Sequence, residues 1–207
     1  MKSSTFSEFQ KLSRKKKLQY ILDYYKIHII AAVALICILF SIITTICKNK
    51  SVDLYTAYVN VAVSDEFTDE LSNTSKLSIT NYTNLLITEN PASENLEYAY
   101  ASSMKLMAAI SDDKLDIIIA DRYGIDMADS NGYLLNPKEF LADNPALYSR
   151  IEPYFIYDKT GAPYAIDLSS CDHYKSAGFS DTVYLGIVAS DTRQKNILTY
   201  LEFLFLQ

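Results

Sequence analysis

The sequence is poor in the residues from which most catalytic and metal sites are built. It has no Trp, and only 2 His, 3 Cys and 5 Gly among 207 residues. With so few histidines and no CxxC pair, a histidine-based or cysteine-based zinc site is excluded. The phosphate-binding patterns GxGxxG and GxxxxGK[ST] and the nucleophile pattern GxSxG are also absent. We therefore expect a protein that is not an enzyme and that uses no cofactor.

One short string does combine reactive residue types: Cys171, Asp172 and His173. Neighbours in an extended strand point to opposite faces, so adjacent residues do not form a nucleophile and base pair. We interpret the string as a surface turn, and Cys171 as a small, partly buried residue.

Positive charge is concentrated at the N-terminal end. Residues 1–47 hold seven basic and two acidic residues, a net charge of +5, which leaves −11 for the rest of a chain whose total is −6. Such segregation indicates two compartments, with the basic end near anionic lipid and the acidic end in water. The acidic remainder excludes nucleic acid as a partner, because phosphate binding needs clustered Lys and Arg.

An apolar run, IHIIAAVALICILFSIITTIC, occupies residues 27–47 and contains no acid, Lys or Arg. About 20 apolar residues at about 1.5 Å each cross a hydrocarbon core of about 30 Å, so the run predicts one transmembrane helix. A cleaved signal peptide is the alternative. Its apolar part would be about 7 to 15 residues long and would end in a small-residue cleavage site. The ending TTICKNK lacks such a site.

The excess of Lys and Arg before the run predicts a cytoplasmic N-terminus in a single-pass plasma-membrane protein. Residues 1–26 then form a basic amphipathic helix on the inner leaflet, although the run at 14–17 alternatively serves only as a topology signal. Residues 27–47 span the bilayer, 48–52 form a linker, and 53–207 form an extracellular domain. The lipid bilayer is thus the first expected partner.

The stretch SRKKKLQYILDYYKIHII, which covers the basic run and the start of the span, carries a resemblance. It looks like the start of small single-span membrane-anchored proteins of unknown function from clostridial and related Gram-positive bacteria. The resemblance implies a bacterial plasma-membrane location and nothing about chemistry.

The outer segment alternates strand and helix patterns. The expected strands are residues 53–63, 76–88, 115–121, 162–170 and 182–190. Among these, LDIIIAD at 115–121 is a continuous apolar run, typical of a strand buried on both faces. With a short acid-rich helix or turn at 65–71, the order predicts an α/β domain: a small mixed, mostly parallel sheet with flanking helices.

Two further helices are expected from apolar residues at three- and four-residue steps. The first follows a cap at Ser93 or Asn95, and its expected packing face is Leu96, Tyr100, Met104, Met107 and Ala108. The second begins at a cap, Asp191, and its expected packing face is Ile197, Leu201, Leu204 and Phe205.

The segment DIIIADRYGIDMADSNGYLLNPKEFL is similar to part of bacterial extracellular solute-binding proteins. The closing VYLGIVAS and DTRQKNILTYLEFLF are similar to their late strand and helix. The domain is too short for the two lobes of such a protein, so the resemblance implies one lobe.

Ligands of open α/β sheets bind beyond the carboxyl ends of the strands. Asn60 and Asp65 lie at or beyond the end of the first expected strand, and Asp121 and Arg122 end the strand at 115–121. We take these four as candidate ligand-binding residues. Capping of the following helix is the alternative role of Asp121.

We therefore expect a membrane-anchored accessory domain that binds a small-molecule ligand or a protein. The alternative is a structural or interaction subunit of a membrane protein complex. The first function predicts a concave polar site at the strand ends, and the second predicts an exposed apolar patch.

Overall fold

The structure, a computed structural model, describes residues 14–50, 52–88, 95–177, 179, 182–189 and 192–206, with side chains described outside 14–25, 45–50 and 176. The chain separates into two units, Met1–Ser51 and Val52–Gln207. Among the residues whose side chains the structure describes, all the buried core residues belong to the second unit.

The first unit contains one long helix, α2 (Arg14–Lys50). Its stretch Lys26–Thr44 is long and apolar enough to cross a membrane, and none of it is buried by protein. A helix that is apolar all round and unburied fits a membrane anchor or a signal sequence. The expected boundaries after residues 26 and 47 fall inside this helix, and residues 1–13 of the expected amphipathic helix lie outside the described residues.

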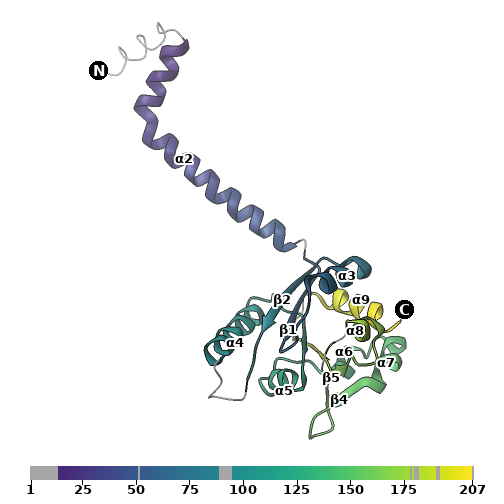
Figure 1. The fold of residues 1–207 in the computed structure, drawn as a ribbon. Coiled ribbons are helices and arrows are strands. Elements are labelled where there is room, and N and C mark those ends of the chain that lie inside the picture. Colours follow the sequence, from purple (N-terminus) through teal and green to yellow (C-terminus); the bar gives the residue numbers. More distant parts are fainter. Residues whose placement is uncertain are drawn as a thin grey trace. The chain divides into compact units, whose positions relative to one another are not determined.

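The second unit is built on a six-stranded sheet with the order β2-β1-β3-β6-β5-β4 (Figure 1). The strands are β1 (Leu54–Val59), β2 (Ile79–Leu85), β3 (Ile117–Ala120), β4 (Phe155–Tyr157), β5 (Pro163–Asp167) and β6 (Tyr184–Ile187). β1 pairs in parallel with β2 and β3, whereas β3–β6, β6–β5 and β5–β4 are antiparallel. The α/β class and the mixed sheet are confirmed.

The expectation of a mostly parallel sheet is wrong, because three of the five strand pairs are antiparallel. For one of them, β4 with β5, the connection explains the direction. Parallel neighbours need a crossover of about a dozen residues or more, usually through a helix. β1, β2 and β3 have such crossovers, but β4 and β5 are joined only by residues 158–162 and form an antiparallel hairpin. β4 itself, a strand of 3 residues, was not expected from the sequence.

Helices cover both faces of the sheet. They are α3 (Asp65–Ser75), α4 (Leu96–Ser111), α5 (Arg122–Ser130), α6 (Pro137–Phe140), α7 (Pro145–Ile151), α8 (Asp172–Ser176) and α9 (Gln194–Phe205), with a 3-10 turn η1 (Glu152–Tyr154). α4 and α5 pack on one core, and α3, α7, α8 and α9 pack on the other (Figure 1). The unit is therefore a three-layer α/β/α arrangement.

The central strand β3 shows how the two cores arise. Ile117 and Ile119 point into the core under α9, while Ile118 and Ala120 point into the core under α4 and α5. All four residues are buried, so the predicted strand buried on both faces is confirmed.

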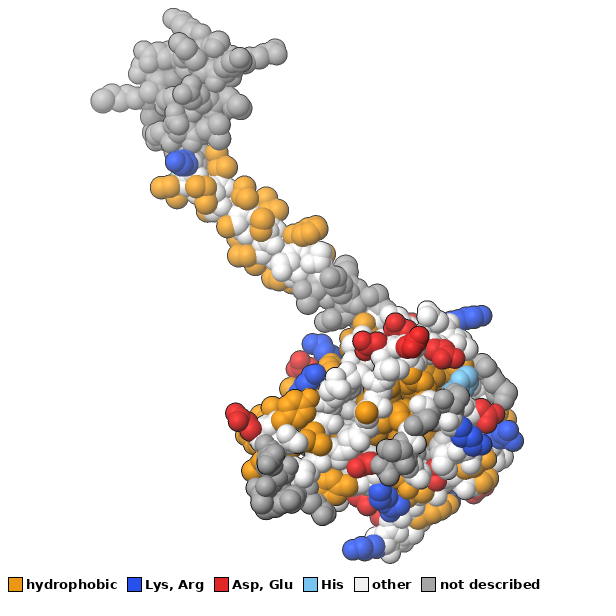
Figure 2. All heavy atoms as spheres, viewed as in Figure 1, with side chains coloured by type: hydrophobic (Ala, Val, Ile, Leu, Met, Phe, Trp, Pro, Cys, Tyr) orange, Lys and Arg blue, Asp and Glu red, His pale blue; other side chains and the backbone are white. Residues whose placement is uncertain are grey.

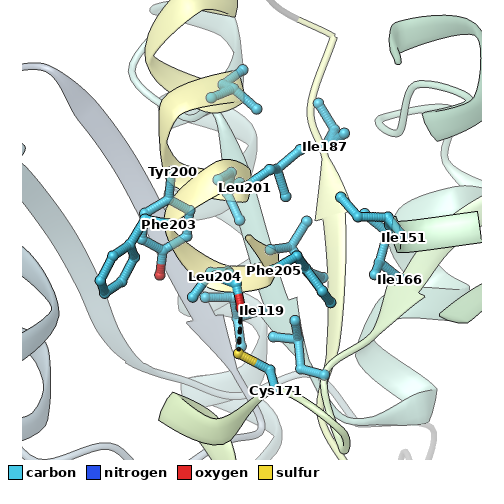
Figure 3. Close-up of a cluster of buried hydrophobic side chains, with 14 of the residues drawn as sticks. Ile119, Ile151, Ile166, Cys171, Ile187, Tyr200, Leu201, Phe203, Leu204 and Phe205 are labelled. Carbon is cyan, nitrogen blue, oxygen red and sulfur yellow. Dashed lines mark hydrogen bonds between the residues drawn. The ribbon is translucent and has the colours of Figure 1, made fainter. Parts of the chain in front are cut away.

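Helix α9 packs through the face that the sequence predicts: Ile197, Leu201, Leu204 and Phe205 are all buried (Figure 3). The expected cap, Asp191, lies outside the described residues. Beside this face, Cys171 is 3% exposed and its Sγ donates a hydrogen bond to the Leu204 carbonyl at 3.5 Å. Burial raises the pKa of the Cys171 thiol, which fits a packing role.

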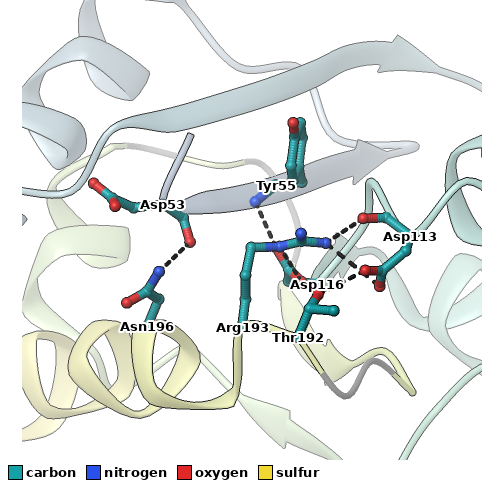
Figure 4. A network of polar contacts seen from close by, with 7 residues as sticks. All are labelled: Asp53, Tyr55, Asp113, Asp116, Thr192, Arg193 and Asn196. Carbon is teal, nitrogen blue, oxygen red and sulfur yellow. Dashed lines mark hydrogen bonds and ion pairs between the residues drawn. The ribbon is translucent and has the colours of Figure 1, made fainter. Parts of the chain in front are cut away.

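A polar network ties the start of α9 to the amino ends of β1 and β3 (Figure 4). The Asp116 carboxylate is fully buried and accepts from Arg193 Nε at 3.0 and 2.9 Å and from the Tyr55 backbone N–H at 2.8 Å. The Arg193 guanidinium also lies 4.9 Å from the centre of the Tyr55 ring. Asn196 Nδ2 donates to the Asp53 carbonyl at 2.7 Å. These contacts stabilise the fold at the edge opposite to the candidate ligand site.

Candidate functional site

Asn60 and Asp121 meet at the carboxyl ends of β1 and β3. Asn60 Nδ2 donates to Asp121 Oδ1 and Oδ2 at 3.1 and 3.3 Å, and Asn60 Oδ1 accepts from the Ile87 backbone N–H at 2.7 Å. Asp121 Oδ1 also accepts from the Gly124 N–H at 2.7 Å as the N-cap of α5. The structure thus shows Asp121 in the capping role that the sequence offered as the alternative.

A cavity of about 470 Å³ lies beside Asn60. It is lined by Asn60, Val61, Ala62, Asn84, Leu85, Leu86, Asn95 and Tyr98. The Tyr98 hydroxyl donates to the Asn84 carbonyl across its edge. No charged side chain is among the described residues that line it, and Asp121 is not part of it. The cavity therefore offers amide and hydroxyl groups to a ligand but no charged group from its described lining residues.

Asp65 and Arg122 do not join the pair of Asn60 and Asp121. Asp65 is an exposed residue in the first turn of α3, a helix whose Leu71 belongs to the core on the other side of the sheet. Arg122 is exposed at the start of α5, where its Nε lies 3.1 Å from Asp126 and its guanidinium 5.7 Å from the Tyr184 ring centre. Of the four candidate residues, the structure brings only two into contact.

A second cavity, of about 430 Å³, was not expected from the sequence. Arg122, Asp126, Asp129, Ser130, Tyr157, Asp158, Lys159, Thr160 and Tyr164 line it. The Tyr164 hydroxyl donates to Asp126 Oδ1 at 2.5 Å, and burial together with this bond raises the pKa of Tyr164. The spacing of Arg122 and Asp126 is visible as an i, i+4 pair in the sequence, but the distant Tyr164 is not.

The acidic groups of this second cavity do not amount to a metal site. Burial and the nearby Asp158 and Asp126 carboxylates raise the pKa of Asp129. Hydrogen bonds from Thr160 and from the Ala162 N–H lower the pKa of Asp158. Within the described ranges, no group of three or more His, Cys, Asp or Glu is arranged to hold a metal ion.

Helix α4 turns most of its large apolar side chains toward solvent. Leu96 is 45%, Tyr100 68%, Met104 48% and Met107 48% exposed, and we call these four residues the α4 stripe. Figure 2 shows hydrophobic side chains gathered over α4 at the left edge of the domain. The prediction that these residues pack on the sheet is wrong.

The opposite side of α4 is the buried one, and it consists mostly of small residues: Ala99, Ser102, Leu106 and Ala109. Small side chains let the helix approach the sheet, where Ala57 and Val59 face the same core. Because both sides of α4 carry apolar residues, periodicity alone does not tell which side is buried.

Two contacts on the β2 side hold α4 in this orientation. Lys105 Nζ lies 5.5 Å from the centre of the Tyr82 ring of β2, and Tyr98 donates to Asn84 at the end of β2. Lys105 and Glu97 are the only charged residues of the helix. The α4 stripe is therefore a fixed apolar surface with little charge around it.

No protein-family model, curated protein or solved structure matches this chain. The two resemblances drawn from the sequence stay predictions. The function must therefore follow from the surfaces of the domain itself.

Proposed function

We propose that this chain is a single-span membrane-anchored interaction protein whose extracellular α/β domain binds another protein through the α4 stripe. The observation that carries the proposal is the exposure of four large apolar side chains on one face of a well-packed helix. This corresponds to the interaction subunit that the sequence offered as an alternative to a ligand-binding domain.

The anchor part of the proposal is supported by helix α2. Its stretch Lys26–Thr44 has the length and composition of a membrane span, although a signal sequence meets the same criteria. Seven of the chain's basic residues precede or begin this stretch, which favours a cytoplasmic N-terminus. The α/β domain then lies outside the plasma membrane.

The composition of the α4 stripe favours a protein as its ligand. Tyr and Met are enriched at the centres of protein interfaces, and contiguous apolar patches on a soluble domain commonly mark such sites. Fully burying one such side chain contributes about 1.5–3 kcal/mol. Because the four side chains are about half exposed, covering them contributes roughly 3–6 kcal/mol.

Two other ligands fit less well. Residues 52–207 hold 10 basic and 23 acidic residues, a net charge of −13, so anionic lipid headgroups repel the domain. A polar ligand at the strand ends would have to compete with the cap that Asp121 forms on Gly124 and with its contact to Asn60. These observations favour protein binding over membrane-surface or small-ligand binding.

The test is the mass of the full-length chain extracted from its membrane in a mild detergent, measured by size-exclusion chromatography with light scattering. Wild-type protein is expected in an assembly larger than one chain. Met104→Glu, which places a charge in the α4 stripe, should release the single chain. Tyr157→Glu changes a residue of similar exposure, 51%, on β4 and should leave the assembly intact. A wild-type protein that runs as a single chain, or an assembly unaffected by Met104→Glu, contradicts the proposal.

A further inference from the structure

We infer that the partner of the α4 stripe is a second copy of this chain, packed α4 against α4 in antiparallel orientation about a two-fold axis. This inference rests on the proposed function and specifies its partner. It comes from the order of residues along the helix, which is nearly the same when read from either end.

The α4 stripe is close to palindromic. The midpoint of Leu96 and Met107 falls between residues 101 and 102, and the midpoint of Tyr100 and Met104 falls on residue 102. At about 1.5 Å per residue, these two centres differ by less than about 1 Å. A two-fold axis at this point places Leu96 against Met107 of the second copy, and Tyr100 against Met104 of the second copy.

Such self-matching is what a two-fold interface requires, because each residue contact occurs twice with the roles exchanged. The central pair brings a thioether to an aromatic ring, a contact that is favourable in itself. The outer pair joins two flexible aliphatic side chains of similar size. All four residues of the α4 stripe are thereby covered in one arrangement.

The two charges of α4 lie away from the proposed contact. At about 100° per residue, Glu97 is about 65° and Lys105 about 145° from the centre of the α4 stripe. Lys105 Nζ lies over the Tyr82 ring of β2 instead. Packing on the α4 stripe therefore leaves Lys105 outside the contact, and the antiparallel orientation follows from the order of the four apolar residues.

The net charge of −13 on residues 52–207 opposes the approach of two domains at long range. Anchoring both chains in one bilayer counteracts this repulsion, because the tether raises the effective concentration of each domain near the other. We therefore expect the pair in membranes that contain the full-length chain, and more of it as salt screens the repulsion.

The experiment uses full-length chains in their membrane, carrying one of two tags, each with one added cysteine. A short, membrane-impermeant bismaleimide reports which positions lie together, and the parent chain with its natural cysteines gives the background. Tyr100→Cys should link to Met104→Cys, and Leu96→Cys to Met107→Cys. Leu96→Cys should not link to itself, because the two copies would lie about 17 Å apart along the helix axis. Tyr157→Cys is the control at another exposed position.

The outcomes separate this inference from the proposed function. Links between the unlike pairs, several-fold above the Tyr157→Cys control, support the antiparallel pair. A Leu96→Cys link to itself without the unlike links means a parallel arrangement and overturns the inference. A third outcome is that no pair of positions crosslinks, although the wild-type chain forms an assembly that Met104→Glu disrupts. The partner is then a different protein, and only the inference of a second copy is wrong. If neither effect is seen, both proposals are wrong.

Discussion

Replacing Arg193 with Met removes the positive partner of the buried Asp116 carboxylate and leaves a side chain of similar length. The Asp116 side chain is 0% exposed and Arg193 is 17% exposed, with Nε 2.9 Å from Oδ2. Removing one member of a buried ion pair costs about 3–5 kcal/mol, because the other charge stays buried without compensation. For a domain of this size, such a loss lowers Tm by roughly 6–20 °C.

The pH dependence of this loss tests its cause. Burial raises the pKa of Asp116, while the hydrogen bonds from Arg193 and Tyr55 lower it. Without Arg193 the folded-state pKa rises further above the unfolded value of about 3.9. A raised carboxyl pKa contributes stability that is full below the unfolded pKa and is lost as pH rises through the folded pKa. The cost of Arg193→Met should therefore be largest near neutral pH and shrink as the pH approaches about 4.

The assay is urea unfolding of Val52–Gln207, followed by far-ultraviolet circular dichroism, at neutral pH and at about pH 4. Lys195→Met removes an exposed charge from the same helix and should change stability by no more than about 0.5 kcal/mol. A loss below about 1 kcal/mol for Arg193→Met at neutral pH would refute the reasoning, since a buried pair is expected to cost more. An equal loss of stability for Arg193→Met at both pH values would also refute the reasoning.

Three further predictions concern the packing of the domain. Leu106 is 5% exposed, so Leu106→Ala should lower the free energy of unfolding in urea by about 2–5 kcal/mol. Met107 is 48% exposed, so Met107→Ala should lower it by no more than about 0.5 kcal/mol. The reverse order would mean that α4 is rotated. Burial raises the pKa of Tyr58 to about 12, so stability should be full below about pH 10 and fall as pH rises through the folded pKa. Tyr58→Phe should flatten this alkaline fall in the urea midpoint, and an unchanged slope would count against a buried Tyr58. Cys171 should react with a maleimide many-fold more slowly in the folded domain than in urea, and equal rates would mean that the thiol is accessible.

The elements that sequence patterns predict well are those with one clear burial pattern. β3 is a continuous apolar run and is buried on both faces, and α9 has a single apolar face that packs on the core. The direction of the late strands is not visible in such patterns. Residues 158–162 make a hairpin of β4 and β5, whereas β5 and β6 are antiparallel although the longer segment 168–183 joins them. This is why the α/β class was predicted and the share of parallel pairing was not.

Helix α4 shows a different limit. Both of its sides carry apolar residues, and the side with the larger ones was expected to face the core because these residues recur at three- and four-residue steps. The structure buries the smaller residues, such as Ala99 and Ala109, because close approach to the sheet needs little volume there. The α4 stripe was thus visible in the sequence as a pattern, but its exposure was not.

The prediction of the candidate ligand site was limited because its side chains contact residues far away in the sequence. The sequence offered both binding and capping for Asp121, and the contact with Asn60, 61 residues away, accompanies the capping role. The pairing of Arg193 with Asp116, 77 residues apart, could not be read from local patterns at all. Local sequence constrains the caps and strand ends, while their partners depend on the topology of the sheet.

The most direct test of the α4 stripe as a binding surface is photo-crosslinking in intact membranes, with benzoylphenylalanine at Tyr100 of the full-length chain. Tyr100 is 68% exposed in the structure of the single chain, and Tyr157, at 51%, is the matched control. The proposal predicts a discrete crosslinked protein adduct from Tyr100 and none from Tyr157. An absence of adduct at Tyr100, or equal adducts from both positions, would contradict it.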